Sequence, residues 1–356
     1  MNNRNKKRVA KKAFKVLAGA GIPTSVIVIA VVLLAVALIV GFVVYKVFFD
    51  KPEEYEIPDG SAEIHYIDVG QGDATLVLAD GMSVLIDTGV KDSEDALINY
   101  LKDKGIQTLD YFIITHFDSD HYGEAADIVD AFKINNLILP DQIKLNNEGE
   151  DQATYKNFMD KVAAKNDEIF VSIIENNDDI GQRVICDDII DIDDKNDRVI
   201  NVGVIDPEKE GDKADLELEF FAPINDDYKD SNDYSVVFML RWGATKMLFT
   251  GDAEKNSEAD IVEKYGMSLD DLFDCDVFKA GHHGSRTSSC DAILEAASPE
   301  YIIISCGVDN SYGHPHSEAM ERFNKVVDED DIYITAEKGT IILTTDGEKI
   351  TVSTEK

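Results

Sequence analysis

The chain has 356 residues, of which 44% are hydrophobic, so it is long enough for one large or two ordinary domains with a sizeable core. This composition excludes a disordered protein. The formal net charge of −36 is uneven, because residues 1–49 contain eight Lys or Arg and no acidic residue. The remainder is therefore strongly acidic and lacks the basic stripes typical of a nucleic-acid-binding surface, although bound divalent cations would make a site locally positive.

The N-terminal segment predicts a membrane anchor. Twenty successive residues, 26–45, carry no charge, which matches a helix that crosses a bilayer core of ~30 Å. A cleaved signal peptide is the alternative, but the apolar run is longer than usual and lacks a small-residue cleavage site. We expect a basic tail at 1–25, a transmembrane helix at 26–48 and a stalk at 49–61.

Basic residues before this helix outnumber those after it, which places the N-terminus in the cytoplasm. The protein would then be a single-pass protein of the cell membrane. Its folded domain, residues 62–356, would lie outside the cell.

Residues 62–114 are predicted to begin this domain as a set of strands. Strand patterns cover 62–69, 75–78, 83–86 and 111–114, and a helical pattern covers 93–104. Asp68 and Asp73 stand at the end of the first strand and in the turn that follows it, and Asp87 follows the third strand. There they would brace the turn, orient metal ligands or contact substrate.

His116, Asp118, Asp120 and His121 directly follow the fourth strand in the run Thr-His-Phe-Asp-Ser-Asp-His. Alternate residues of a loop can turn toward one point, and His121 begins the next helix, so all four side chains can reach one metal centre. A polar loop with Asp120 as helix N-cap is the alternative, which the two flanking histidines disfavour.

Residues 123–230 show a weaker pattern. A strand near 137–139 and a helix at 151–165 are typical of a globular domain, whereas residues 176–215 are rich in acidic side chains. We expect that acidic segment to be a surface excursion with a few strands. It lacks the spacing of an EF-hand loop, so we expect no calcium site there.

A regular pattern returns after residue 232 and again ends its strands in chemically active residues. Strands at 236–240 and 246–249 lead to Asp252, and a strand at 276–279 leads to Gly-His282-His283-Gly-Ser285. The remaining expected elements are helices at 253–265, 289–297 and 317–327, a strand at 301–305 before the loop of Asn310 and His314, and three closing strands.

Five of the seven histidines lie in such strand-end loops: His116, His121, His282, His283 and His314. His65 within a strand and His316 beyond the last loop are expected to be ordinary structural residues. The five, with Asp118, Asp120 and Asp252, predict a centre of two divalent metal ions. Asp252 arrives alone from another strand and is suited to bridge the ions, and a hydroxide between them would be the nucleophile.

Two other chemistries are weaker. A Ser-His-Asp triad would use Ser119 or Ser285, but neither lies in a Gly-x-Ser-x-Gly turn. The four cysteines show no zinc-binding spacing and are expected to be packing residues, although their even number would permit a disulfide.

The motifs together resemble the metallo-β-lactamase fold superfamily, and within it the hydrolase domain of the ComEC competence proteins. The matching stretches occur in the family's order: Asp68-Val-Gly-Gln-Gly-Asp73, Asp87-Thr-Gly89, Thr115-His-x-Asp-x-Asp-His-x-Gly123, Asn232-x-x-Ser235, Thr250-Gly-Asp252, Gly281-His-His-Gly-Ser285 and Asn310-Ser-Tyr-Gly-His-Pro315. The resemblance implies an α/β fold, a four-layer αβ/βα sandwich, and hydrolysis at a metal centre.

Departures from the family pattern narrow the expected function. Asp118 stands where metallo-β-lactamases usually carry His, and the interval before Asp252 holds Asn232 and Ser235 but no histidine. Both features argue against β-lactam substrates, and the oxygen-rich site shifts the choice from zinc toward manganese or a weakly held ion. ComEC proteins have many membrane helices and this chain has one apolar segment, so DNA transport is not implied.

We therefore expect a membrane-anchored, metal-dependent hydrolase, a phosphodiesterase or nuclease with zinc or manganese, whose phosphodiester substrate could be DNA. A wall-polymer or phosphorylcholine phosphodiesterase is the alternative among enzymes. A cell-surface binding module on a metal-degenerate scaffold is the alternative among other classes.

The expected roles divide the residues between two ions. His116 and Asp118 would hold one ion, Asp120, His121 and one of His282 and His283 the other, and Asp252 would bridge them. Asp120 and His314 are the expected catalytic residues, with His314 contacting the oxygen of the scissile group or protonating the leaving group. Asn310 and Ser285 would assist, and Asn232 and Ser235 would orient ligands or contact substrate.

Overall fold

The computed structural model describes residues 24–49, 55, 57–58, 60–91, 95–140, 150–165, 167–175, 187–194, 196–202, 216–225, 227–265 and 272–356. The chain divides into two compact units, Met1–Glu54 and Tyr55–Lys356. Helix α2 (Thr24–Phe49) lies in the first unit, and several of its Leu, Ile and Val side chains are exposed. Within the described ranges, no helix combines the length and apolarity that a membrane span requires. The transmembrane helix at 26–48 stays a prediction.

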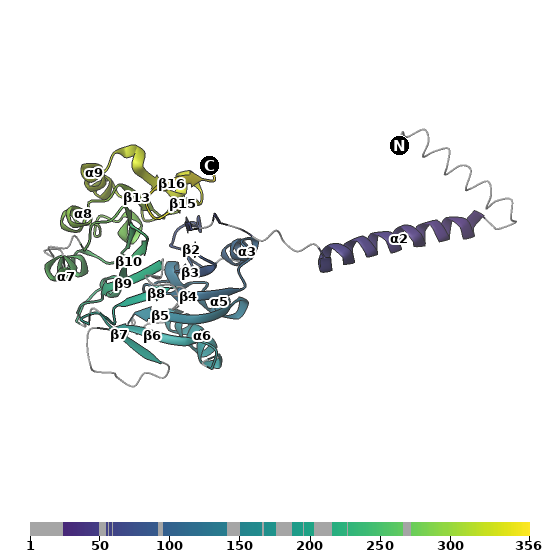
Figure 1. Ribbon diagram of the computed structural model, residues 1–356, viewed down its shortest axis with the longest axis horizontal. Coiled ribbons are helices and arrows are strands. Elements are labelled where there is room, and N and C mark those ends of the chain that lie inside the picture. Colours follow the sequence, from purple (N-terminus) through teal and green to yellow (C-terminus); the bar gives the residue numbers. More distant parts are fainter. Residues whose placement is uncertain are drawn as a thin grey trace. The chain divides into compact units, whose positions relative to one another are not determined.

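Two β-sheets form the second unit (Figure 1). One sheet contains β1 (Ala62–Tyr66), β2 (Thr75–Ala79), β3 (Met82–Ile86), β4 (Thr108–Ile113), β5 (Lys133–Pro140), β6 (Phe170–Glu175), β7 (Asp188–Asp191), β15 (Ile341–Thr345) and β16 (Ile350–Thr354). Its strand order is β16-β15-β1-β2-β3-β4-β5-β6-β7.

The other sheet contains β8 (Val199–Val202), β9 (Leu216–Ala222), β10 (Val237–Trp242), β11 (Thr245–Phe249), β12 (Val277–Lys279), β13 (Tyr301–Ile304) and β14 (Ile332–Ile334). Its order is β14-β13-β12-β11-β10-β9-β8. β7 and β8, which belong to the acidic segment at 176–215, are the edge strands of the two sheets.

Alternating side chains along each strand build two cores. In β2, Val77 and Ala79 pack into the core shared by the two sheets, whereas Leu76 and Leu78 pack into a separate core under helices. This period of two is what a strand buried on both faces produces. The two sheets therefore face each other across a continuous apolar layer.

Helices cover the outer face of each sheet (Figure 1). Side chains of α3 (Ala96–Asp103), α5 (Ala125–Ala131) and α6 (Glu150–Ala164) complete the core outside the nine-stranded sheet. Apolar residues of α7 (Lys255–Tyr265), α8 (Asp291–Ala297) and α9 (Ser317–Val326) join the core of the seven-stranded sheet. The order helix, sheet, sheet, helix confirms the predicted αβ/βα sandwich.

Short helices mark the loops at the strand ends: α4 (Ser119–Tyr122), α10 (Thr335–Lys338) and the 3-10 turns η1 (Asn232–Tyr234), η2 (Gly281–Gly284) and η3 (Glu329–Asp331). Cys275, Cys290 and Cys306 are free thiols, and Cys186 lies outside the described residues. The disulfide that the even number of cysteines would permit is therefore not formed among the three described cysteines.

Parallel pairing brings the chemically active loops to one edge of each sheet. β3 and β4 pair in parallel, as do β11, β12 and β13. The carboxyl ends of parallel strands lie at the same edge of a sheet, and the loops that follow them form the usual binding site. Asp87 and His116 follow β3 and β4, and Asp252 and the paired histidines follow β11 and β12.

Candidate metal centre

Asp252 lies among four histidines. Its Oδ1 is 3.1 Å from Nε2 of His121, and its Oδ2 is 3.6 Å, 3.7 Å and 3.8 Å from Nε2 of His283, His282 and His116. Burial would raise the pKa of Asp252, but the charges of these neighbours hold it well below its usual range. One buried carboxylate thus faces ring nitrogens from two different loops, those after β4 and β12.

The loop after β4 supplies two further carboxylates of the predicted metal centre, those of Asp118 and Asp120. Asp120 Oδ2 lies 3.2 Å from Nε2 of His283, and this contact lowers the Asp120 pKa to about 2 despite burial. Asp118 adopts extended backbone geometry before α4, and its side chain caps no N–H of that helix. Burial and the charge of Asp252 raise the Asp118 pKa to about 6, as expected for a carboxylate without a compensating cation.

The Nδ1 atoms of three histidines have fixed partners. Asp87 Oδ2 lies 2.8 Å from Nδ1 of His121, the carbonyl oxygen of Ser305 lies 3.0 Å from that of His283, and Glu254 Oε1 lies 3.2 Å from that of His282. A partner on one ring nitrogen fixes the orientation of the other. In each case the Nε2 atom is left to face Asp252.

Asp87 is itself held by the backbone. Its Oδ1 accepts the Thr115 N–H at 2.8 Å, and its Oδ2 accepts the Thr115 hydroxyl at 2.6 Å. The residue has a positive φ of 56°, a conformation that Asp tolerates better than most side chains. Asp87 therefore orients His121, one of the roles expected for it.

The donor set fits divalent metal ions. His116 Nε2 and Asp73 Oδ1 are buried without a hydrogen-bond partner in the described part of the chain. A buried polar atom left unpaired costs about 1–3 kcal/mol, which a bound cation would offset. One ligand atom each of Asp73, His121, Asp252 and His283 also lies within 4.8 Å of the others. Imidazole nitrogens and carboxylate oxygens are ligands of zinc and manganese.

Protonation of the histidines follows from their neighbours. Burial lowers the pKa of each ring, but Asp252 and other carboxylates raise the net pKa of His121 well above its usual value and that of His283 to about 10. For His116, burial and the charge of His121 lower the pKa to about 4. His116 is therefore neutral at pH 7, as a metal ligand must be, whereas His121 and His283 would give up protons to a metal ion.

Asn232 and Ser235 lie beside the cluster, as the sequence predicts. Asn232 Nδ2 is 3.3 Å from Nδ1 of His282, and the Ser235 hydroxyl oxygen accepts the N–H of Asp252 at 3.1 Å. Both orient cluster residues.

Asp68 and Ser285 have other contacts. Asp68 accepts the N–H of Gly70 within its own turn and pairs with Lys356 at 3.3 Å, which is the turn-bracing role. The Ser285 hydroxyl bonds that of Thr287 at 2.9 Å, so its expected assistance to catalysis gains no support from the geometry.

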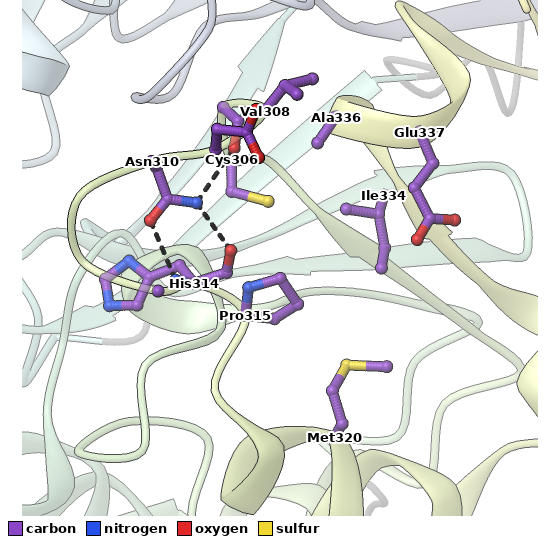
Figure 2. Close-up of a pocket in the computed structure, with 12 residues that line it drawn as sticks. Cys306, Val308, Asn310, His314, Pro315, Met320, Ile334, Ala336 and Glu337 are labelled. Atoms are coloured by element: carbon purple, nitrogen blue, oxygen red, sulfur yellow. Dashed lines mark hydrogen bonds between the residues drawn. The ribbon is translucent and has the colours of Figure 1, made fainter.

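Asn310 holds the loop that carries His314 (Figure 2). Its amide nitrogen donates to the carbonyl oxygens of Gly307 and His314, and its Oδ1 accepts the His314 N–H at 2.9 Å. The side-chain amide is thereby committed to backbone atoms. Asn310 therefore shapes the loop, and the direct assistance expected of it is not what these contacts favour.

The His314 ring lies 5.5 Å from the His282 ring and 5.9 Å from the His283 ring, centroid to centroid. His314 lines a pocket of about 540 Å³ together with Pro315, Met320 and Ile334, and in Figure 2 its ring is turned to the side away from Met320 and Ile334. Burial and the positive charges of the paired histidines lower the His314 pKa to about 4. A neutral ring favours a hydrogen bond to substrate oxygen over proton donation by an imidazolium.

Sequence reasoning missed three contributors: Thr115, Glu254 and Lys279. Lys279 is the last residue of β12 and only 2% exposed, and its Nζ donates to Asp73 Oδ2 at 2.8 Å. A charged residue in an otherwise apolar strand was the available signal. Thr115 and Glu254 act on residues distant in sequence, which no local pattern shows.

Comparison with known proteins gives a family match. The profile of the Metallo-beta-lactamase superfamily matches residues 67–308. ComE operon protein 3 of Bacillus subtilis is 27% identical over 285 residues, covering 75% of this chain and 31% of the relative. Recombination protein 2 of Haemophilus influenzae is 27% identical over 268 residues, covering 74% of this chain and 26% of the relative. The chain thus spans about a third or less of these relatives.

Among solved structures, the metallo-beta-lactamase fold protein YhfI from Bacillus subtilis covers 80% of this chain and all of its own, with 11% identity and a TM-score of 0.46.

Proposed function

The chain belongs to the metallo-beta-lactamase superfamily, and on this basis we propose that its folded unit is a metal-dependent phosphodiesterase. The observation that carries the proposal is the Asp252 carboxylate within 3.1–3.8 Å of four histidine nitrogens. A carboxylate among several imidazoles is suited to bridge two divalent ions.

The proposed ligands divide as the sequence predicts. His116 and Asp118 would hold one ion, Asp120, His121 and His283 would hold the other, and Asp252 would serve both. His283 is preferred to His282 here because its Nε2 lies beside both Asp120 and Asp252. His282, with Glu254 and Asn232 on its other nitrogen, stays a further candidate ligand. When bound, the ions supply Lewis-acid activation of water and of the phosphoryl oxygen.

Residues of the chain itself then bind and orient the substrate. Neutral His314 donates a hydrogen bond to a phosphoryl oxygen, and Asn310 keeps it in place. Asp87, Ser305 and Glu254 hold the histidine rings so that their Nε2 atoms stay directed at the centre. These contacts preorganise the site before substrate arrives.

A phosphodiester is favoured over a β-lactam by the oxygen-rich ligand set. Recombination protein 2 is named for a process that acts on DNA, and this supports a nucleic-acid substrate. The formal charge of −36 instead favours a small or wall-polymer phosphodiester such as a phosphorylcholine ester, because an acidic surface repels a polyanion.

We further propose that the apolar run at residues 26–45 anchors the protein in the cell membrane with the catalytic unit outside. The uncharged length of that run and the basic residues before it support this topology.

The substrate class can be tested with the full-length chain, stripped of metal and then supplied with Mn²⁺ or Zn²⁺. Single-stranded DNA, bis-p-nitrophenyl phosphate, p-nitrophenyl phosphorylcholine and a β-lactam are compared at several salt concentrations. We expect hydrolysis of phosphodiesters and not of the β-lactam. Metal uptake without turnover of any ester would instead support the binding-module alternative.

A further inference from the structure

A buried ion pair lies beneath the metal centre. Lys279 Nζ donates to Asp73 Oδ2 at 2.8 Å and to the carbonyl oxygen of Ala280 at 3.1 Å. Lys279 is 2% exposed and Asp73 is 5% exposed. A lysine this deeply buried is tolerated only when it is paired. The pair joins the two sheets, because Lys279 ends β12 and Asp73 precedes β2.

The second oxygen of Asp73 faces the cluster. Asp73 Oδ1 lies 3.6 Å from Nδ1 of His283 and is buried without a hydrogen-bond partner in the described residues. The backbone fixes this position, since the Asp73 N–H donates to the carbonyl oxygen of Asp120 at 3.1 Å. A ligand atom of Asp73 also lies within 4.8 Å of ligand atoms of His121, Asp252 and His283. Asp73 is thus close enough either to support His283 or to bind an ion itself.

We propose that Lys279 is a positioning residue whose ammonium group keeps Asp73 beside His283 and out of the metal ligand set. The inference rests on the proposed metal centre. A metal ion binds neutral His283, so in the metal-bound site loss of Lys279 would leave Asp73 as a buried carboxylate whose nearest positive charge is the divalent ion. An added carboxylate ligand would raise the coordination number and weaken the ion as a Lewis acid.

A purely structural role for Lys279 makes a different prediction. If the pair only fastened the two sheets together, loss of Lys279 would lower the melting temperature and leave the ligand set unchanged. Positioning requires that the effect on the metal depend on Asp73.

The test uses the full-length chain, stripped of metal and titrated with Co²⁺, whose visible absorption weakens as its coordination number rises. For Lys279→Met we expect the molar absorption of the bound Co²⁺ to fall by about twofold or more. The double variant Lys279→Met/Asp73→Asn should return to the wild-type spectrum, because an amide is a poorer ligand than a carboxylate. The control is Lys246→Met. Lys246 lies on the neighbouring strand β11 and pairs with Asp274 at 3.7 Å, so its loss should leave the spectrum unchanged.

Circular dichroism shows whether Lys279→Met is folded, and the conservative variant Lys279→Arg keeps a cation beside Asp73. Lys279→Arg should therefore keep the wild-type spectrum. An unchanged spectrum in folded Lys279→Met, a changed one in folded Lys279→Arg, or a change that persists in the double variant would overturn the inference. A wild-type chain that takes up no Co²⁺ would overturn the proposed function, and this inference with it.

Discussion

Oδ1 of Asp252 lies 3.1 Å from Nε2 of His121, although the two residues extend from different sheets of the sandwich. His121 belongs to the loop after β4, and Asp252 follows β11. A metal ion held by both residues would therefore connect the two halves of the fold. Metal binding should then stabilise the folded unit as well as activate it.

Metal removal is expected to lower the melting temperature. A ligand that binds only the folded state stabilises it by about 2.7 kcal/mol at a concentration one hundred times its Kd. Differential scanning calorimetry of the stripped chain with rising Mn²⁺ or Zn²⁺ should show a melting temperature that climbs with metal concentration. A melting temperature that does not respond to metal would show that the ions do not bind across the sheets.

Metal binding is expected to release protons. His121 and His283 carry raised pKa values, the latter about 10, because carboxylates surround them, so this pair of rings holds a proton at pH 7 without metal. A metal ion binds the neutral ring, so the apparent affinity should increase as pH rises toward about 10. Calorimetric titrations in buffers of different ionisation enthalpy should report the release of about one proton or more per chain. An affinity independent of pH would contradict the assignment of these two ligands.

Asp87→Asn should weaken metal binding without emptying the site. Asn keeps the size of the side chain and tolerates the left-handed backbone at this position, but it loses the charge that faces Nδ1 of His121. Loss of such a supporting carboxylate typically costs about 10–100-fold in metal affinity or activity. Competition with a chromophoric chelator measures the affinity. Equal affinities for variant and wild type would show that Asp87 only braces its turn.

His314→Gln should lower kcat for bis-p-nitrophenyl phosphate by about 10–100-fold while metal content stays at the wild-type level. The reason is that His314 lies beside the paired histidines but is proposed to contact substrate. Asn310→Ala should give a smaller loss, because it frees the loop without removing the ring. Loss of a metal ion in His314→Gln, measured by elemental analysis, would place this residue among the ligands instead.

Much of the fold could be predicted from sequence because its signals are local. The alternation of buried side chains in β2 and the helical spacing of apolar residues in α9 are visible within a few neighbouring residues. Glycines mark many of the turns that join the elements. The His116–His121 loop was equally accessible, since its ligand types lie within six residues of one another.

The supporting contacts of the site could not be predicted in the same way. The charge of Lys279 in an apolar strand is visible in the sequence, but its partner Asp73 lies 206 positions earlier, beside a strand of the other sheet. Asn310 stands in a motif next to a histidine, which suggested a catalytic partner, whereas its amide satisfies backbone atoms of its own loop. Residues 176–186 and 203–215 of the acidic segment lie outside the described ranges, so the excursion there stays a prediction.

The central claim is that Asp252 bridges two metal ions required for phosphodiester hydrolysis. Its most direct test compares wild type, Asp252→Ala and the control Asp260→Asn. Asp260 lies on α7, where its carboxylate accepts the Tyr228 hydroxyl. Metal per chain is measured by elemental analysis together with turnover of bis-p-nitrophenyl phosphate. We predict about two ions per chain and turnover in wild type and control, and for Asp252→Ala the loss of at least one ion with a fall in kcat of at least about 100-fold. Full metal content and turnover in Asp252→Ala would contradict the account.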